Sequence, residues 1–148
     1  MTTIRQAEGP DDMRTARALF QEYADWLGID LSYQDFEREL AELPGAYAPP
    51  KGRLLLGEVD GAAVGCIALR PLEPGIGEVK RLYLRPALQG RGLGRRLAET
   101  LVAEARLIGY RTLRLDTLAR LTAANTLYAS LGFRPIAPYY RNPTEGVL

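Results

Sequence analysis

Three glycines at alternate positions, Gly90, Gly92 and Gly94, lie between two segments of different hydrophobic period. Residues 78–85 (EVKRLYLR) alternate in the manner of a strand, and residues 92–108 repeat apolar side chains at helical spacing. Glycines at such a junction let backbone N–H groups turn inward without interference from a Cβ atom. The start of the helix adds unpaired N–H groups and the positive end of its dipole. The junction therefore predicts an anion site, and a phosphate is the usual occupant.

The junction differs from two better-known phosphate loops. A P-loop ends in Gly-Lys followed by Ser or Thr, whereas Gly94 is followed by Arg95 and Arg96. The dinucleotide fingerprint would need a glycine at position 95. Arg91, Arg95 and Arg96 are either solvated residues at a helix start or phosphate contacts. Because positive charge is unfavourable at a helix N-terminus, we expect at least one of them to contact the anion.

The composition limits the function classes. The 148 residues are 47% hydrophobic and 25% charged, which indicates one globular domain over residues 1–148. A net charge of +1, with no apolar run of membrane length, gives no reason to expect a nucleic-acid or membrane partner. A single cysteine, Cys66, and a start without a signal-peptide pattern favour the cytoplasm. The chain has no histidine, so a general base must be a carboxylate, Lys, Tyr or water, and no metal site is expected.

The other segments predict an α/β fold of helices packed on a mixed sheet, because strand-like and helix-like periods follow each other along the chain. The expected elements are a strand at 3–5, helices at 10–27 and 33–43, strands at 53–59, 62–72 and 78–85, a helix at 92–108, a strand at 111–117, a helix at 122–131 and a last strand at 133–136.

Two sequence blocks resemble those of a known family. QGRGLG, which begins at Gln89, resembles the pyrophosphate loop of the GNAT superfamily of acyl-CoA-dependent N-acyltransferases. AANTLYASLGFRP, residues 123–135, resembles that family's next conserved segment, a helix that carries Asn and Tyr and ends in Gly-Phe. The element order is also similar, so the resemblance covers nearly the whole chain. It implies a mixed, mostly antiparallel sheet flanked by about four helices, in the order β-α-α-β-β-β-α-β-α-β. A further strand would follow residues 139–146, where only two residues remain.

The resemblance implies acetyl-CoA as the acyl donor. Its pantetheine arm would pair with the backbone of Leu82, Tyr83 and Leu84, and the amide near Leu84 would polarise the acetyl carbonyl. The side chain of Asn125 would contact CoA. Backbone amides across the loop would hold the pyrophosphate, namely those of Gln89, Gly90, Arg91, Gly92, Leu93, Gly94 and Arg95.

The same resemblance makes Tyr128 the general acid that protonates the departing thiolate. Its other interpretation is a core aromatic on one stripe with Ala124 and Leu131, and the two are compatible because a phenol can pack its ring and still direct its hydroxyl into a cleft.

Glu78 is the candidate general base, at a position that carries a catalytic glutamate in some members of the family. Alternatively, it is a strand-end carboxylate paired with Lys80, or with Arg70 across the hairpin. Glu58 and Asp116 are further candidates for the base. Cys66, in the middle of a predicted strand, is expected to be a small buried hydrophobe rather than an acetylated nucleophile.

The acceptor would be a primary amine on a small molecule or a protein. In this family the first helices and a late loop line the acceptor site. Arg70, Lys80 and Arg81 favour an acceptor that bears a carboxylate, such as an amino acid. Aromatic side chains could cage the amine or simply pack. These regions carry Tyr23, Trp26, Tyr33, Tyr47, Tyr139, Tyr140 and Arg141.

The sequence favours direct transfer in a ternary complex over two alternatives, a non-catalytic acyl-CoA-binding regulatory domain and an unrelated phosphate-binding domain. Tyr128 and Asn125 support the enzyme, because a pure binding domain needs no acid for a thiolate. A homodimer is left open.

Overall fold

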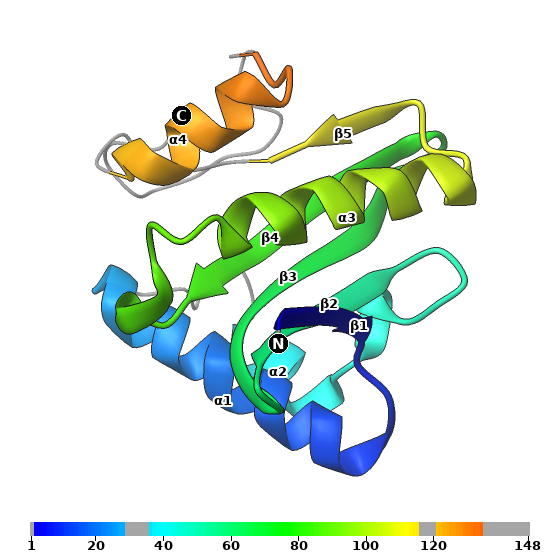
Figure 1. Cartoon of the computed structure of the whole chain (residues 1–148). Coiled ribbons are helices and arrows are strands. Elements are labelled where there is room, and N and C mark those ends of the chain that lie inside the picture. The colour runs from blue at the N-terminus through cyan, green and yellow to red at the C-terminus, as the bar shows by residue number, and fades with distance from the viewer. Residues whose placement is uncertain (1, 29–35, 116–120, 135–148) are drawn as a thin grey trace.

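The computed structural model describes residues 2–28, 36–115 and 121–134 (Figure 1). The predicted order of elements is confirmed as far as the helix at 122–131, and most boundaries agree within one or two residues. Phe133 and Arg134 belong to no strand, and the rest of the last predicted strand lies outside the described residues. The elements are β1 (Thr2–Gln6), α1 (Gly9–Leu27), α2 (Phe36–Glu42), the 3-10 turn η2 (Gly45–Tyr47), β2 (Arg53–Val59), β3 (Ala62–Glu73), β4 (Ile76–Leu84), the 3-10 turn η3 (Pro86–Leu88), α3 (Leu93–Ile108), β5 (Thr112–Arg114) and α4 (Thr122–Ser130).

The sheet follows chain order, β1-β2-β3-β4-β5, as the mixed and mostly antiparallel sheet that the resemblance implied. The first three pairings are antiparallel, and β5 pairs parallel to β4. A tight turn at Asp60 and Gly61 joins β2 to β3. Both residues have positive φ, 50° and 84°, which is the geometry that favours an Asp-Gly hairpin.

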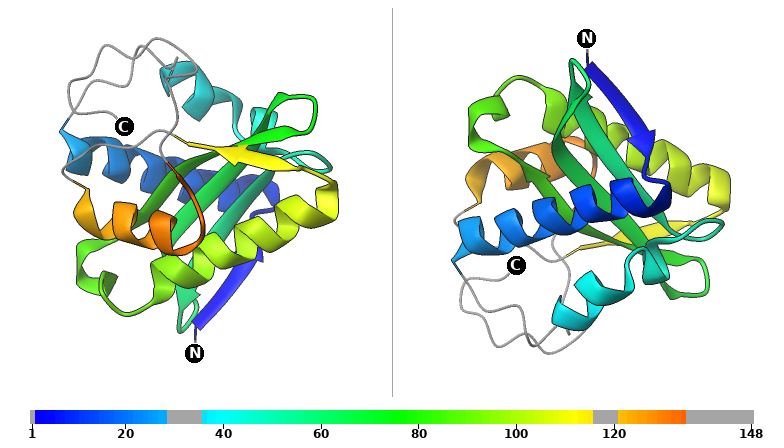
Figure 2. Two further views of the ribbon diagram at one scale, coloured as in Figure 1. Left: turned by 90° about the horizontal axis from the view of Figure 1, so that it is seen from above. Right: turned by 90° about the horizontal axis from the view of Figure 1, so that it is seen from below.

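Helices cover both faces of the sheet and create two apolar layers (Figure 2). On one face, Phe20 of α1 and Phe36 of α2 pack against Leu54, Leu56 and other sheet residues. On the other face, Leu97 of α3 packs with Ile67, and α4 joins this layer through half-buried apolar side chains. We therefore refer to the α1–α2 face and the α3–α4 face of the sheet.

Strict alternation, predicted for residues 78–85, is wrong at one position because β4 contains a bulge. The register moves from Ala68 opposite Lys80 to Cys66 opposite Tyr83, so β4 has one extra residue there. Val79 and Leu82 are three residues apart, yet both pack on the α3–α4 face. The side chains before and after the bulge therefore keep to their faces although the sequence period changes.

Arg5 of β1 connects the sheet to the start of α1. Its guanidinium donates two hydrogen bonds to Asp12, of 2.6 and 2.8 Å, and a third of 2.9 Å to Glu58 of β2. Asp12 also accepts the backbone N–H of Glu8 at 2.8 Å, so its carboxylate closes the helix start. The hydrogen bonds from Arg5 and from that amide hold the pKa of Asp12 at about 2, below its ordinary value.

Replacement of Asp12 by Asn should lower the free energy of unfolding by about 1 kcal/mol at neutral pH, because it removes a charge-assisted pair at a partly exposed site. The folded-state pKa of Asp12 is depressed, so its contribution is complete above the unfolded value of 3.8 and is lost as the pH falls toward 2. Urea unfolding at several pH values should show that the difference between Asp12→Asn and wild type shrinks in this range. Asp11→Asn, at a carboxylate with 90% side-chain exposure in the same turn, is the control and should have less effect. A difference that does not depend on pH would refute this role.

Candidate active site

Strands β4 and β5 pair over a short length only. Ile76, Gly77 and Glu78 are opposite Thr112, Leu113 and Arg114, and the pairing described ends there. On its other edge, β4 stays paired with β3 as far as Leu84. From Val79 onward, then, no strand of the described chain covers the β5 edge of β4.

The backbone groups on this edge can be assigned from two hydrogen bonds. The N–H of Arg85 donates to Val64 on the β3 side at 2.9 Å. Peptide groups alternate along a strand, so Leu84 and Leu82 direct theirs away from β3, and Tyr83 directs its own toward β3. In agreement, Nε2 of Gln89 donates to the Leu84 carbonyl at 3.0 Å. Of the three backbone positions that the resemblance implied, Leu82 and Leu84 thus have the orientation needed to pair with a ligand on the β5 edge.

The glycine loop connects this edge to the start of α3. Gly92 is the N-cap residue, with φ of 82°, a conformation that a residue with a Cβ rarely adopts. Gly94 has no such φ, but a Cβ at this position would lie 3.3 Å from Cδ1 of Leu84. Gly92 thus allows the turn, and Gly94 allows the start of α3 to approach β4 closely.

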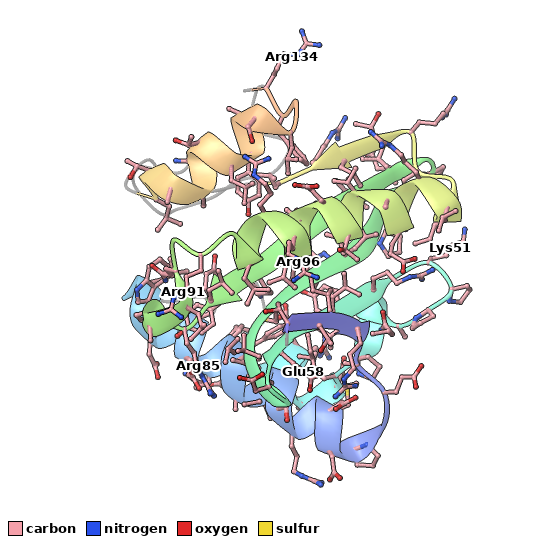
Figure 3. All side chains as sticks on the ribbon, viewed as in Figure 1. Lys51, Glu58, Arg85, Arg91, Arg96 and Arg134 are labelled. Atoms are coloured by element: carbon pink, nitrogen blue, oxygen red, sulfur yellow. The ribbon has the colours of Figure 1, made fainter. Side chains whose placement is uncertain are left out.

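Charge at the start of α3 is positive. The first turn has no acidic residue and no side-chain cap, so its N–H groups are directed at the loop together with the dipole. Figure 3 shows Arg91 in the loop and Arg85 on the chain after β4, both at the left of the view, and Arg96 further along on α3. Arg95 instead contacts α4, donating to Oγ of Ser130 at 2.7 Å. Arg91 and Arg96 are both exposed, and the positive start of α3 is compatible with the anion site predicted from the sequence.

Helix α4 lies beside the start of α3, so the fold brings the two sequence blocks together. Besides the Arg95–Ser130 bond, Leu127 lies 3.9 Å from the position that a Cβ on Gly94 would occupy. Tyr128 is half-buried, and its ring centroid is 5.7 Å from that of Phe133 in an edge-to-face contact. Asn125 is also half-buried. The packing interpretation of Tyr128 therefore holds in part.

Glu78 lies where β4 and β5 separate, and it is fully buried. Its Oε1 accepts Nε of Arg70 at 2.8 Å, directly across the hairpin. The structure thus contains one of the two ion pairs considered for this carboxylate. A role as base would require Glu78 to act while it is paired with Arg70.

The basic residues expected for an acceptor carboxylate are largely engaged or enclosed by the protein. Arg70 contacts Glu78, and Arg81 contacts Glu39 of α2 through two hydrogen bonds of 2.9 Å. Lys80 is buried, with an exposed fraction of 6%. Arg81 is therefore committed to the protein itself, while the side chain of Arg70 keeps 35% exposure.

The remaining candidates are placed less favourably. Glu58 lies on β2, two strands from β4, and is bound by Arg5 (Figure 3). Asp116 lies outside the described residues, as do Tyr33, Tyr139, Tyr140 and Arg141. Cys66 is fully buried, donates its S–H to the Arg81 carbonyl at 3.3 Å, and has its pKa raised by burial. A neutral, enclosed thiol of this kind is not a nucleophile, in agreement with the expectation for Cys66.

The sequence analysis did not identify two carboxylates that bind basic residues of β4 and its continuation, Glu22 of α1 and Glu39 of α2. Glu22 binds Arg85 through two hydrogen bonds of 3.0 Å and accepts the hydroxyl of Tyr83 at 3.4 Å. Trp26 and Tyr23 lie beside the same Tyr83 ring, with centroids 6.1 and 5.9 Å away. The only signal in the sequence for Glu39 is its spacing of three from Phe36, which places both on one helix face.

Within the described ranges, the acidic residues and Cys66 form no cluster suited to a metal ion. None of the helices described has the length and apolarity needed to cross a membrane.

Comparison with known proteins gives a consistent result. Residues 14–133 match the profile of the Acetyltransferase (GNAT) family. An uncharacterised N-acetyltransferase of Schizosaccharomyces pombe is 40% identical over 148 aligned residues, with 99% of this chain and 91% of the relative covered. Shorter matches include an IAA acetyltransferase of Azospirillum brasilense, 38% identical with 65% of both chains covered, and the N-acetylaspartate synthetase of Danio rerio, 30% identical with 73% of this chain but only 40% of the relative covered.

Solved structures agree with these relatives. An acyl-CoA N-acyltransferase of Klebsiella pneumoniae superposes with a TM-score of 0.73 at 34% identity, covering 97% of this chain and 92% of the other. An acetyltransferase of Salmonella typhimurium, solved with its cofactor acetyl-CoA, has a TM-score of 0.71 at 25% identity, with 92% and 81% covered. With the uncovered β4 edge, the glycine loop and the adjacent α4 helix, these matches show that the chain belongs to the GNAT acetyltransferase family and is an acyl-CoA-dependent acetyltransferase.

Proposed function

We propose that this acetyltransferase moves an acetyl group from acetyl-CoA to the primary amine of a small molecule, by direct transfer in a ternary complex. The observation that carries the proposal is the continuity of three features, the β5 edge of β4, the glycine loop and the uncapped start of α3. A protein amine is the other class of acceptor. The acetyl-CoA in the Salmonella typhimurium structure supports the choice of donor.

The donor would lie along these features in order. Peptide groups of Leu82 and Leu84 are oriented to pair with the pantetheine amides, and the loop from Gln89 to Arg95 is positioned for the pyrophosphate. The Leu84 carbonyl accepts Gln89, but a carbonyl has two lone pairs and can accept a second donor. The backbone N–H of Leu84 is the candidate to stabilise the negative charge that develops on the acetyl oxygen.

The chemical step requires three proton movements. The ammonium of the acceptor first gives one proton to Glu78, directly or through water, and becomes a nucleophilic amine. The amine nitrogen then forms a bond to the acetyl carbon, the carbon–sulfur bond breaks, and the departing thiolate takes the proton of the Tyr128 hydroxyl. The second proton of the nitrogen restores that hydroxyl. In this role Glu78 would accept the proton while its Oε1 is bound to Nε of Arg70 at 2.8 Å.

The acceptor is proposed to be an amine that also carries a carboxylate, such as an amino acid. Arg81 is already bound to Glu39, so it is not proposed to bind the acceptor carboxylate. Arg70 is the candidate partner for that carboxylate, although its Nε already donates to Glu78. The N-acetylaspartate synthetase among the relatives is named for the product of such an amine.

The first test of this function is the placement of the donor. Gly92→Val and Gly109→Val change glycines at opposite ends of α3, both with positive φ and both with open space around the added side chain. Each should lower stability by about 1 kcal/mol or more through backbone strain. Only Gly92→Val should also weaken acetyl-CoA binding, measured by calorimetry, because only this end of the helix would contact the pyrophosphate.

Equal acetyl-CoA affinity in these two variants would place the pyrophosphate elsewhere. Tighter binding of ATP or NAD than of acetyl-CoA by the wild-type protein would count against the donor itself.

A second test addresses Tyr128. Tyr128→Phe keeps the ring contact with Phe133 and removes the acidic proton, so turnover should fall by roughly 10²–10⁴ while acetyl-CoA affinity is preserved. Tyr110→Phe, which removes a hydroxyl bonded to the carbonyl of Lys51 at the far end of α3, is the control and should retain turnover. Unchanged turnover in Tyr128→Phe would mean that another group, such as water, protonates the thiolate.

A third test separates the two roles of Glu78. If Glu78 accepts the ammonium proton, Glu78→Gln should lower kcat/KM at neutral pH, and part of the loss should return as the pH rises toward the pKa of the amine. A purely structural Glu78 would instead give pH profiles of the same shape and a lower free energy of unfolding, since Arg70 would lose its partner. The measurement is kcat/KM against pH for both proteins with one identified acceptor.

A further inference from the structure

Arg81 occupies the bulge of β4 in an unusual backbone conformation. Its φ is 63°, in the left-handed region where glycine is normally found, and it follows Lys80 at the point where the register with β3 changes. A long side chain in this conformation persists only where its surroundings hold it there.

The surroundings of Arg81 supply three such contacts. Nε and one terminal nitrogen of the guanidinium donate to the two carboxylate oxygens of Glu39, each at 2.9 Å. The guanidinium carbon lies 5.3 Å from the ring centroid of Phe36, also on α2. The Arg81 carbonyl accepts the S–H of Cys66 on β3. Only 3% of the Arg81 side chain is exposed, so the free-energy cost of burying its positive charge has to be offset by the ion pair with Glu39.

The bulge decides which peptide groups face the β5 edge. Because the extra residue is inserted before Leu82, the amides of Leu82 and Leu84 face that edge, and their side chains pack on the α3–α4 face. Without the insertion, every later residue of β4 would exchange both its face and its peptide direction. Tyr83 would then present its amide to the edge in place of Leu84.

We propose that Arg81 and Glu39 are positioning residues for acyl transfer: their ion pair holds the β4 bulge against α2, and the bulge aims the Leu82 and Leu84 amides at the acyl donor. This role rests on the proposed function of those amides. It also couples α2, a helix on the α1–α2 face of the sheet, to the donor strand. Neither residue needs to touch a substrate.

The first experiment compares Arg81→Gly with Arg81→Ala. Both remove the ion pair, but glycine adopts a positive φ without strain whereas alanine does not. If the bulge is what matters, Arg81→Gly should retain acetyl-CoA affinity better than Arg81→Ala, and it should keep the amide chemical shifts of Leu82 and Leu84 closer to wild type in the ligand-free protein. If Arg81 only packs, Arg81→Gly should bind acetyl-CoA as weakly as Arg81→Ala or more weakly, because glycine leaves the larger void. An acetyl-CoA affinity of Arg81→Gly that does not exceed that of Arg81→Ala would overturn the proposal.

The second experiment tests Glu39. Glu39→Gln should raise the Kd for acetyl-CoA by about tenfold or more, since the amides are no longer held in position. Glu104→Gln is the control, because it weakens another helix-to-sheet ion pair, between α3 and Arg53 of β2, and should leave that Kd unchanged. If both variants lose stability and neither loses acetyl-CoA affinity, the ion pair is only structural. Failure of the wild-type protein to bind acetyl-CoA would instead reject the proposed function, so the two failures are distinguishable.

Discussion

Within the described residues, strand β4 has strand neighbours on both edges as far as Glu78 and on one edge beyond it, and the proposed donor site depends on this difference. Beyond that residue β3 continues to pair with β4, which keeps the strand rigid, while the described part of β5 does not. Backbone N–H and C=O groups bind strongly to suitable partners, so an uncovered and rigid edge is a ready template for an extended ligand with amide groups. A pantetheine arm is such a ligand.

The uncovered edge leads directly into the predicted anion site because the chain turns immediately at its end. Arg85 returns to β3 through a hydrogen bond, η3 reverses the direction, and Gly92 starts α3 with a left-handed conformation. The close approach of Gly94 to Leu84 brings the helix start against the strand. An elongated molecule with amides at one end and phosphates further along matches this succession of groups better than a free phosphate or a nucleotide would.

The α1–α2 face contains charges that a simple apolar core would exclude. Glu78 is paired with Arg70, and Arg81 is paired with Glu39; the side chains of Glu78 and Arg81 are almost completely buried. Removing charges from water is expensive, and such pairs often contribute little net stability compared with apolar residues of similar volume. Their presence beside the strand that would hold the donor is therefore better explained by geometry and chemistry than by stability.

Much of the fold could be predicted from local patterns. Hydrophobic period located the helices and strands, Asp60-Gly61 indicated the hairpin, and Gly90, Gly92 and Gly94 indicated the turn from β4 into α3, because each of these depends on residues close together in the sequence. The short range of that information also explains the error in β4. A bulge at Arg81 is maintained by Glu39, Phe36 and Cys66, and none of these is a sequence neighbour.

The sequence by itself determined the order of elements, the junction with its positive charge, and the two blocks that resemble one family. Only the tertiary structure decided which groups remain available to a ligand. It paired Arg81 with Glu39 and Glu78 with Arg70, set Leu82 and Leu84 rather than Tyr83 toward the uncovered edge, and brought α4 against the start of α3. The physical reason is that ion pairing and strand register depend on distances between residues far apart in the chain, which the packing of helices on the sheet establishes.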